Sequence, residues 1–499
     1  MISYKKGEIT AFLSIVFVLL VSFIFAMLES AVIQTSKNEY RLLADLAIYS
    51  VFGEYQKDLF DDYRIFALEG TYEKGSFAEE EIIHRMRYFG AMGMEHEITD
   101  MQLLTDNYGK AFREQVHSHM MTAVGGDIMS TLTGMSSDWS QQLIVGEAAE
   151  QAQGEIFSDL VDALDENETS LPDADNPLGF MDRFLKAPLL TIATSKEFTI
   201  SNQRINLEEQ VSKRTLRQGR GSLPGQDNLD DIQNKAIFKA YILRNFSYAT
   251  AKKDYESGDM EDLSPQEMGG DVSEDEKQNP ETRKRNLSYE VEYILEGKNS
   301  DEQNLQAVAT KILLIRVGMN YGYLLKDSPK RAAVKAASAA ISAVGGVTAP
   351  ALLIAIEHAI LITWAFAESV MDIRALLDGN KVAFVKSSNT WKLSLQSLIK
   401  WAEKGDVGAI AGESDEEAGK GKDDPGGLSY REYLFGFLMA QNINQQTMRS
   451  IDRVEQNLIF EKGKNFFRAD NCISKIRLQN IATIRGDITY DFPLYFGYN

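Results

Sequence analysis

The chain has 499 residues. A single hydrophobic core seldom serves a chain of this length, so two or more packed lobes are expected. Its formal net charge of -21 repels phosphate backbones, which argues against nucleic acid as a partner. Cys472 is the only cysteine, which excludes an internal disulfide and a thiolate cage for zinc or an iron–sulfur cluster. Hydrophobic residues make up 44% of the chain, enough to build packed cores despite the acidic excess.

Residues 9–28 read ITAFLSIVFVLLVSFIFAML, an uncharged run of the roughly 20 residues that a helix needs to cross a bilayer. Lys5 and Lys6 precede this run and Glu29 follows it. The positive-inside bias therefore predicts a cytoplasmic N-terminus, residues 1–8, with the bulk of the chain extracytoplasmic. A cleaved secretory signal is the alternative, but its apolar region usually has only about 7 to 15 residues. We predict a retained, single-pass transmembrane helix in the cell membrane.

Residues 29–68 contain no proline and continue the helical pattern of the anchor. An apolar stripe recurs at helical spacing, at Leu42, Leu46, Tyr49 and Gly53. The anchor is therefore predicted to extend as an amphipathic helical stalk.

Residues 69–255 are predicted to form a first extracytoplasmic lobe. Residues 94–104 show partial alternation of apolar and polar residues, which predicts a strand. A helix is expected next, with an inward face made of Phe112, Val116, His119 and Ala123. Residues 256–286 lack aliphatic clusters and are predicted to be a disordered acidic linker.

Residues 287–404 are predicted to form a second lobe. Apolar residues alternate with polar ones over residues 287–295, which indicates a strand. A helix then follows, with a stripe at Leu305, Val308, Ile312, Ile315 and Met319. Residues 336–367 could form a second membrane crossing. Pro350, Glu357 and His358 favour the alternative, two buried, Ala-rich helices inside the fold.

The C-terminal part is predicted to begin after a flexible acidic loop at residues 405–427. Residues 428–499 are then expected to form a helix and an exposed antiparallel hairpin that turns at Gly486 and Asp487. The fold class that follows is α+β and mainly helical: a transmembrane helix, a helical stalk, and an extracytoplasmic helical domain with small antiparallel β elements.

The sequence offers no constellation of catalytic, cofactor-binding or metal-binding residues, so an enzyme is not expected. His117 and His119 form the only close histidine pair, but residues two apart on a helix point in different directions. Asp173 and Asp175 resemble the start of a calcium loop, but the glycine and glutamate of that pattern are not in register. No phosphate-binding glycine loop with a following Lys-Ser or Lys-Thr occurs, and no nucleophile elbow.

The first residues, KKGEITAFLSIVFVLLVSFIFAMLESA, resemble the N-terminus of type IV pilin-like proteins, in particular the TadE and TadG-like components of tight-adherence (Flp) pilus systems. The resemblance implies a processing site at Gly7 and Glu8, where a prepilin peptidase would cut after the glycine. The glutamate stands directly after Gly7, whereas the pilin pattern has it at the fifth position, here Phe12. The alternative is a glycine and a glutamate that only precede a transmembrane helix.

Three later segments are similar to an uncharacterised family of membrane proteins from Gram-positive bacteria: YEVEYILEGKNSDEQNLQAVATKILLIR, ITWAFAESVMDIRALLDGNKVAFVK and LSYREYLFGFLMAQ. That similarity covers most of the chain and implies no mechanism. The expected function is a structural or assembly protein, accessory to a Tad pilus-like or secretion system, with the lipid bilayer and other membrane or pilus-assembly proteins as partners. The alternatives are a cell-surface binding module for cations, wall polymers or proteins, and an enzyme with an unrecognised site.

Overall fold

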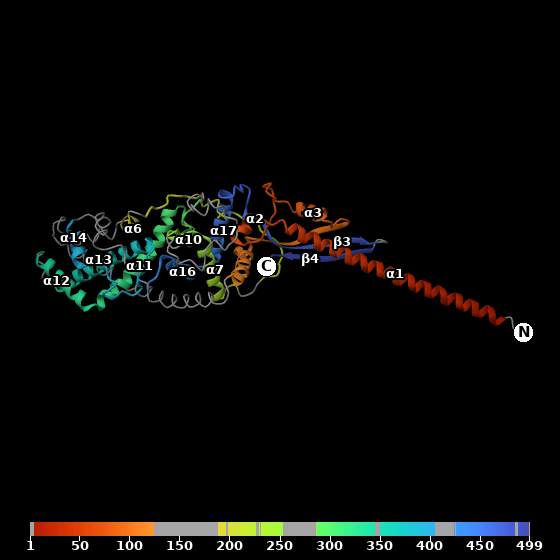
Figure 1. The fold of residues 1–499 in the computed structure, drawn as a ribbon, viewed down its shortest axis with the longest axis horizontal. Helices are drawn as coiled ribbons and strands as arrows, with labels where there is room; N and C mark the ends of the chain where they lie inside the picture. The colour runs from red at the N-terminus through yellow and green to blue at the C-terminus, as the bar shows by residue number, and fades with distance from the viewer. Residues whose placement is uncertain are drawn as a thin grey trace. The chain divides into compact units, whose positions relative to one another are not determined.

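The computed structural model describes residues 4–123, 188–195, 198–225, 229, 231–252, 286–344, 350–404, 424, 426–484 and 488–498 (Figure 1). The chain divides into two compact units. The first, here the sheet unit, contains Met1–Gln115, Thr215–Asp227 and Lys462–Asn499. The second, the helical unit, contains Val116–Arg214 and Asn228–Glu461. As predicted, the fold is mainly helical with one small antiparallel sheet.

The units interleave along the sequence, whereas the expected lobes, residues 69–255 and 287–404, were contiguous. The reason is the C-terminal hairpin, because strand β3 (Cys472–Ile484) pairs with strand β2 (Met94–Leu103) from the beginning of the chain. The expected linker, residues 256–286, lies outside the described residues except for Asn286, and the loop at 405–427 does so except for 424, 426 and 427.

Helix α1 (Tyr4–Phe52) has 49 residues, which corresponds to a length of about 74 Å. Its second part packs on the sheet with a face made of Ala44, Ala47, Ile48, Val51 and Phe52. The predicted stripe is not this face: Leu42, Leu46 and Tyr49 are 58%, 54% and 68% exposed. The packed face has alanines at positions 44 and 47, and their small side chains let the helix lie close to the strands.

The chain leaves α1 earlier than expected for a stalk over residues 29–68. Residues 57–63 form the short helix α2 (Lys57–Tyr63), followed by strand β1 (Leu68–Glu69) and helix α3 (Glu79–Tyr88). Helix α3 buries Ile82 and Met86 in the same core as α1.

Strand β3 lies at the centre of a four-stranded antiparallel sheet, with β2 on one side and β1 and β4 (Ile488–Gly497) on the other. The predicted strand at 94–104 is confirmed as β2. Its alternation is only partial because the register shifts between Ile98 and Asp100, so Ile98 and Met101 both face the core. The C-terminal hairpin is confirmed, but β3 is buried and not exposed; its expected turn at Gly486 and Asp487 lies outside the described residues.

The helical unit contains α6 (Leu189–Ala193), α7 (Ile232–Asn245), α10 (Glu290–Glu296), α11 (Asp301–Lys326), α12 (Ser328–Val344), α13 (Pro350–Leu377), α14 (Leu395–Lys404), α16 (Tyr430–Ala440) and α17 (Ile443–Phe460). Helices α11 and α13 pack side by side (Figure 1). Ser300 caps α11, its side chain accepting a hydrogen bond from the Gln303 amide. Of the stripe predicted for this helix, Leu305, Val308, Ile312 and Ile315 are buried.

The strand predicted at residues 287–295 is wrong, because this segment forms helix α10 from Glu290 to Glu296. The alternating residues do not separate an inner from an outer face: Val291 and Tyr293 are buried, and so are Glu290 and Glu292. Each of these carboxylates accepts hydrogen bonds, which offset part of the cost of burying it in a helix that is enclosed all round.

Residues 336–367 form two helices, as favoured, and Pro350 begins α13 instead of interrupting it. From Ile356 to Leu377, α13 is enclosed almost completely by other parts of the helical unit. Helix α12 buries a single face, with Val334, Ser338 and Ser342 four residues apart, so only one of the two Ala-rich helices is a core helix.

In the predicted helix of residues 112–123, Phe112 and Val116 are buried, as expected, His119 is half-buried and Ala123 is exposed.

Candidate functional site

The first half of α1 carries a continuous exposed apolar surface. Its side chains from Ile9 to Val32 are mostly open, and none of its most apolar 18-residue stretch is buried. Within the described part of the chain, α1 is the one helix found long and apolar enough to cross a membrane. The two halves of α1 therefore differ: the first is apolar and exposed, and the second packs in the core of the sheet unit.

Gly7 and Glu8, the predicted processing site, lie in the first turns of α1 and are exposed. A Cβ atom added at Gly7 would meet nothing within 4 Å, so no other part of the described chain covers this position. Gly7 and Glu8 are therefore accessible in the described part of the chain, as the predicted cleavage requires.

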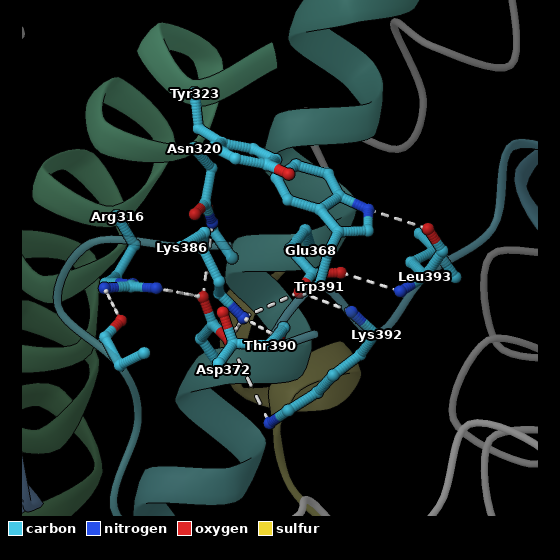
Figure 2. A network of polar contacts seen from close by, with 12 residues as sticks. Arg316, Asn320, Tyr323, Glu368, Asp372, Lys386, Thr390, Trp391, Lys392 and Leu393 are labelled. Carbon is cyan, nitrogen blue, oxygen red and sulfur yellow. Dashed lines mark hydrogen bonds and ion pairs between the residues drawn. The ribbon is translucent and has the colours of Figure 1, made fainter. Parts of the chain in front are cut away.

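The helical unit contains a group of buried charged side chains on α11, on α13 and on the segment that follows α13 (Figure 2). We call it the charge cluster; its members are Arg316, Glu368, Asp372, Lys386 and Lys392. The side chains of Arg316, Glu368 and Asp372 are fully buried, and that of Lys386 is 1% exposed. Lys392 is 14% exposed.

Asp372 is the centre of the charge cluster. Its Oδ2 accepts hydrogen bonds from Arg316 Nε at 3.0 Å, Arg316 Nη2 at 2.7 Å and Asn320 Nδ2 at 3.2 Å. Its Oδ1 lies 2.7 Å from Lys386 Nζ and 4.0 Å from Lys392 Nζ. Arg316 also donates through Nη1 to the carbonyl oxygens of Ala383 and Phe384, which ties the segment after α13 to α11.

Glu368 lies one helical turn before Asp372 on α13. Its Oε1 accepts hydrogen bonds from Lys386 Nζ at 2.7 Å and from the Lys392 amide, and its Oε2 accepts one from the Leu393 amide. Lys386 therefore stands between two buried carboxylates (Figure 2). Both oxygens of each carboxylate are used, so the cluster fixes its own geometry.

Two tryptophans hold the backbone that donates to Glu368. The indole N–H groups of Trp364 and Trp391 both donate to the Leu393 carbonyl, at 2.9 and 2.8 Å. The ring of Tyr323 stacks on Trp391 with centroids 5.3 Å apart. Figure 2 shows the rings of Tyr323 and Trp391 beside the charge cluster.

Burial and charge act in opposite directions on these groups. Burial would raise the pKa of Asp372, but the Arg316, Lys386 and Lys392 charges outweigh burial and lower that pKa to about 2. Burial raises the pKa of Glu368, and the opposing attraction of Lys386 does not cancel this. Burial also lowers the pKa of Lys392. The carboxylates thus differ: Asp372 favours the charged form, and Glu368 holds a proton more readily.

A second buried polar group surrounds α10. Glu290 accepts hydrogen bonds from Arg453 and from Asn457, and Glu292 accepts one from the Tyr430 hydroxyl at 2.8 Å. Burial raises the pKa of Glu292 to about 7. These contacts join α10 to α16 and α17.

His117 hydrogen-bonds Asn234, and no group of three possible metal ligands occurs among the described residues. Asp173 and Asp175 lie outside those residues. Sequence inspection missed the charge cluster, since its members are spread over residues 316–392. The only available signal was their presence in apolar helices, as for Glu368 and Asp372 in α13.

Comparison with known proteins gives one match. A model for a family of unknown function, DUF5702, matches residues 167–484. The chain belongs to this family. The matched region covers α10, α11, α13, α17 and the charge cluster, but it begins after α1. No curated protein and no solved structure matches the chain.

Proposed function

We propose that this DUF5702 protein is a single-pass membrane protein with an extracytoplasmic structural domain, which serves the assembly of a pilus-like or secretion apparatus. The observation that carries the proposal is α1, a single helix that is apolar and exposed in its first half and part of a folded core in its second half. The choice of a pilus-like or secretion apparatus rests on the resemblance of residues 5–31 to TadE and TadG-like components.

The continuity of α1 supports a structural role. Between Gly7 and Gly53 the helix contains no glycine and no proline, so it lacks the residues at which helices usually kink. A tilt or translation of the membrane half is therefore passed directly to the sheet unit. Such rigid coupling suits a component that positions others, because a flexible linker would be sufficient for a domain that is only tethered.

The orientation can be tested by cysteine labelling, because the only native cysteine, Cys472, is fully buried. Tyr88 is 78% exposed, so Tyr88→Cys should react with a membrane-impermeant maleimide on intact cells. Lys6→Cys is the control and should react only after permeabilisation. The opposite pattern would reverse the topology, and labelling of both only in the soluble fraction would refute the anchor.

The assembly role needs a partner test. Chemical crosslinking on cells, followed by purification in detergent, should recover membrane subunits of a pilus or secretion machine. A variant that lacks residues 1–28 should stay folded, leave the membrane and lose these crosslinks. Recovery of wall glycans or soluble ligands in place of machine subunits would favour a surface binding module and count against assembly.

A further inference from the structure

The charge cluster contains the parts that an amide-forming reaction needs. An amine nitrogen, Lys386 Nζ, lies 2.7 Å from Asp372 Oδ1 and 2.7 Å from Glu368 Oε1. Since a carbon–oxygen bond is about 1.2 Å long, this nitrogen is within about 4 Å of the Asp372 carboxyl carbon. We propose that Lys386 and Asp372 condense to an intramolecular isopeptide bond, with Glu368 as the proton carrier.

The step balances without any co-reactant. Glu368 takes one proton from Lys386 Nζ and passes it to Asp372 Oδ1, which makes the amine and the carboxyl group neutral. The amine then attacks Cγ of Asp372, which places negative charge on Oδ2. Glu368 takes a second proton from the nitrogen and passes it to Oδ1. Oδ1 then leaves as water, and the nitrogen keeps one hydrogen as the new amide. One C–N bond forms, one C–O bond breaks, and nothing is oxidised or reduced.

The surroundings favour the tetrahedral intermediate of this reaction. The charge that develops on Oδ2 faces three donors already in place, Arg316 Nε, Arg316 Nη2 and Asn320 Nδ2. Donors fixed before the reaction stabilise such a charge strongly in a site without water. The raised pKa of Glu368 suits a group that must both accept and release a proton.

Burial also favours the product. The charge cluster holds five ionic groups in the interior, where each costs several kcal/mol of desolvation free energy. Condensation removes one positive and one negative group together, so the net charge is unchanged and three ionic groups remain. The fold holds the amine and the carboxyl together, which replaces a bimolecular encounter by a unimolecular step. Exclusion of water then slows hydrolysis of the amide.

The chain provides a matched comparison. Lys475 and Glu114 in the sheet unit also form a buried pair, with Nζ and Oε2 2.5 Å apart and side chains 2% and 3% exposed. Lys475 has one carboxylate partner in the part of the chain that is described, whereas Lys386 has two. A second carboxylate is what the proton transfers require, so this pair should remain an ion pair.

The test is the intact mass of the purified full chain under denaturing conditions. We expect a mass lower than that of the unmodified chain by one water molecule. Trypsin does not cut after an acylated lysine, so digestion should give residues 336–374 joined to residues 382–392. Residues 469–475 should be released without a link. A full mass, with residues 382–386 as a free peptide, would overturn the proposal even if every variant failed to fold.

Two conservative variants separate the roles. Lys386→Arg keeps the positive charge without the amine, and Glu368→Gln keeps the shape without the proton carrier. Both should show the full mass, while Lys475→Arg should leave the loss of water unchanged. A link that persists in Glu368→Gln would overturn the role given to Glu368. Removal of the first seven residues by cleavage after Gly7 changes the mass by far more than one water, so the two modifications are distinguishable.

Discussion

The sheet unit and the helical unit use different interior chemistry. The sheet unit closes α1 and α3 over one face of a sheet with a core of aliphatic and aromatic side chains, and it also buries the Lys475–Glu114 ion pair. The helical unit encloses charges, including Arg316, Asp372 and Arg453 with no exposed surface. Apolar contacts are non-directional and tolerate replacement by a similar volume, whereas a buried charge depends on its particular partner. Apart from the Lys475–Glu114 pair, substitutions should therefore act through side-chain volume in the sheet unit and through charge pairing in the helical unit.

Asp372→Ala should have the largest effect. It leaves Arg316 and Lys386 buried without their shared partner, and loss of one partner from a buried pair costs about 3–5 kcal/mol of unfolding free energy. Trp364 and Trp391 belong to the helical unit and the sheet unit contains no tryptophan, so tryptophan fluorescence during urea unfolding measures this unit selectively.

Lys311→Ala is the matched control for Asp372→Ala. Lys311 pairs with Glu296 in the same unit, but its side chain is 39% exposed. A pair of this kind contributes about 1 kcal/mol at most. Equal losses in the two variants would mean that burial does not distinguish the pairs, and the contrast between the units would fail.

Ile48→Ala tests the apolar core of the sheet unit. Ile48 is 1% exposed and packs on the sheet, so its truncation should cost about 2–5 kcal/mol. Leu46→Ala on the open side of the same helix should change the unfolding free energy by less than about 0.5 kcal/mol. Hydrogen exchange of the β3 amides, measured by mass spectrometry, reports the stability of the sheet unit. A larger effect at Leu46 would show that something covers the open face.

Glu292→Gln should change how stability depends on pH. The folded pKa of about 7 lies above the unfolded value of 4.5, so the folded state binds the proton more tightly. The resulting stabilisation is complete below pH 4.5 and is lost as the pH rises to about 7, a difference of about 3 kcal/mol.

An amide at this position accepts from Tyr430 as the carboxyl does, without a charge to bury. At pH 8 the Glu292→Gln variant should therefore unfold at a higher urea concentration than the native chain, and the two should converge near pH 4. Parallel pH profiles would show that Glu292 is not the group that titrates.

Sequence patterns predicted what depends on local periodicity. The apolar helix, β2, the C-terminal hairpin and α11 could be found because one face of each is apolar at the expected spacing. The alternation at residues 287–295 wrongly predicted a strand, because the polar residues Glu290 and Glu292 are buried. Each accepts hydrogen bonds from donors far away in the sequence. Burial of a charge is decided by tertiary partners, and no local pattern reports them.

The face of α1 shows the same limit. Both the stripe of Leu42, Leu46 and Tyr49 and the stripe of Ala47, Ile48 and Val51 have helical spacing. The sheet selects the second, because alanine allows closer packing. The charge cluster could not be predicted either, since it joins Arg316 on α11 to Asp372 on α13 and to Lys386 beyond it.

The smallest predicted effect concerns a single cap in the helical unit. Ser429 begins α16 with a reciprocal pair of hydrogen bonds: its hydroxyl accepts from the Glu432 amide, and the Glu432 carboxylate accepts from the Ser429 amide. Ser429→Ala should cost about 1 kcal/mol, and Ser429→Asp, which can also cap, should recover most of it. Faster hydrogen exchange confined to the first turn of α16 is the expected signature. No change in either variant would mean that α16 is held by packing alone, and that polar pairing in this unit matters only where charge is buried.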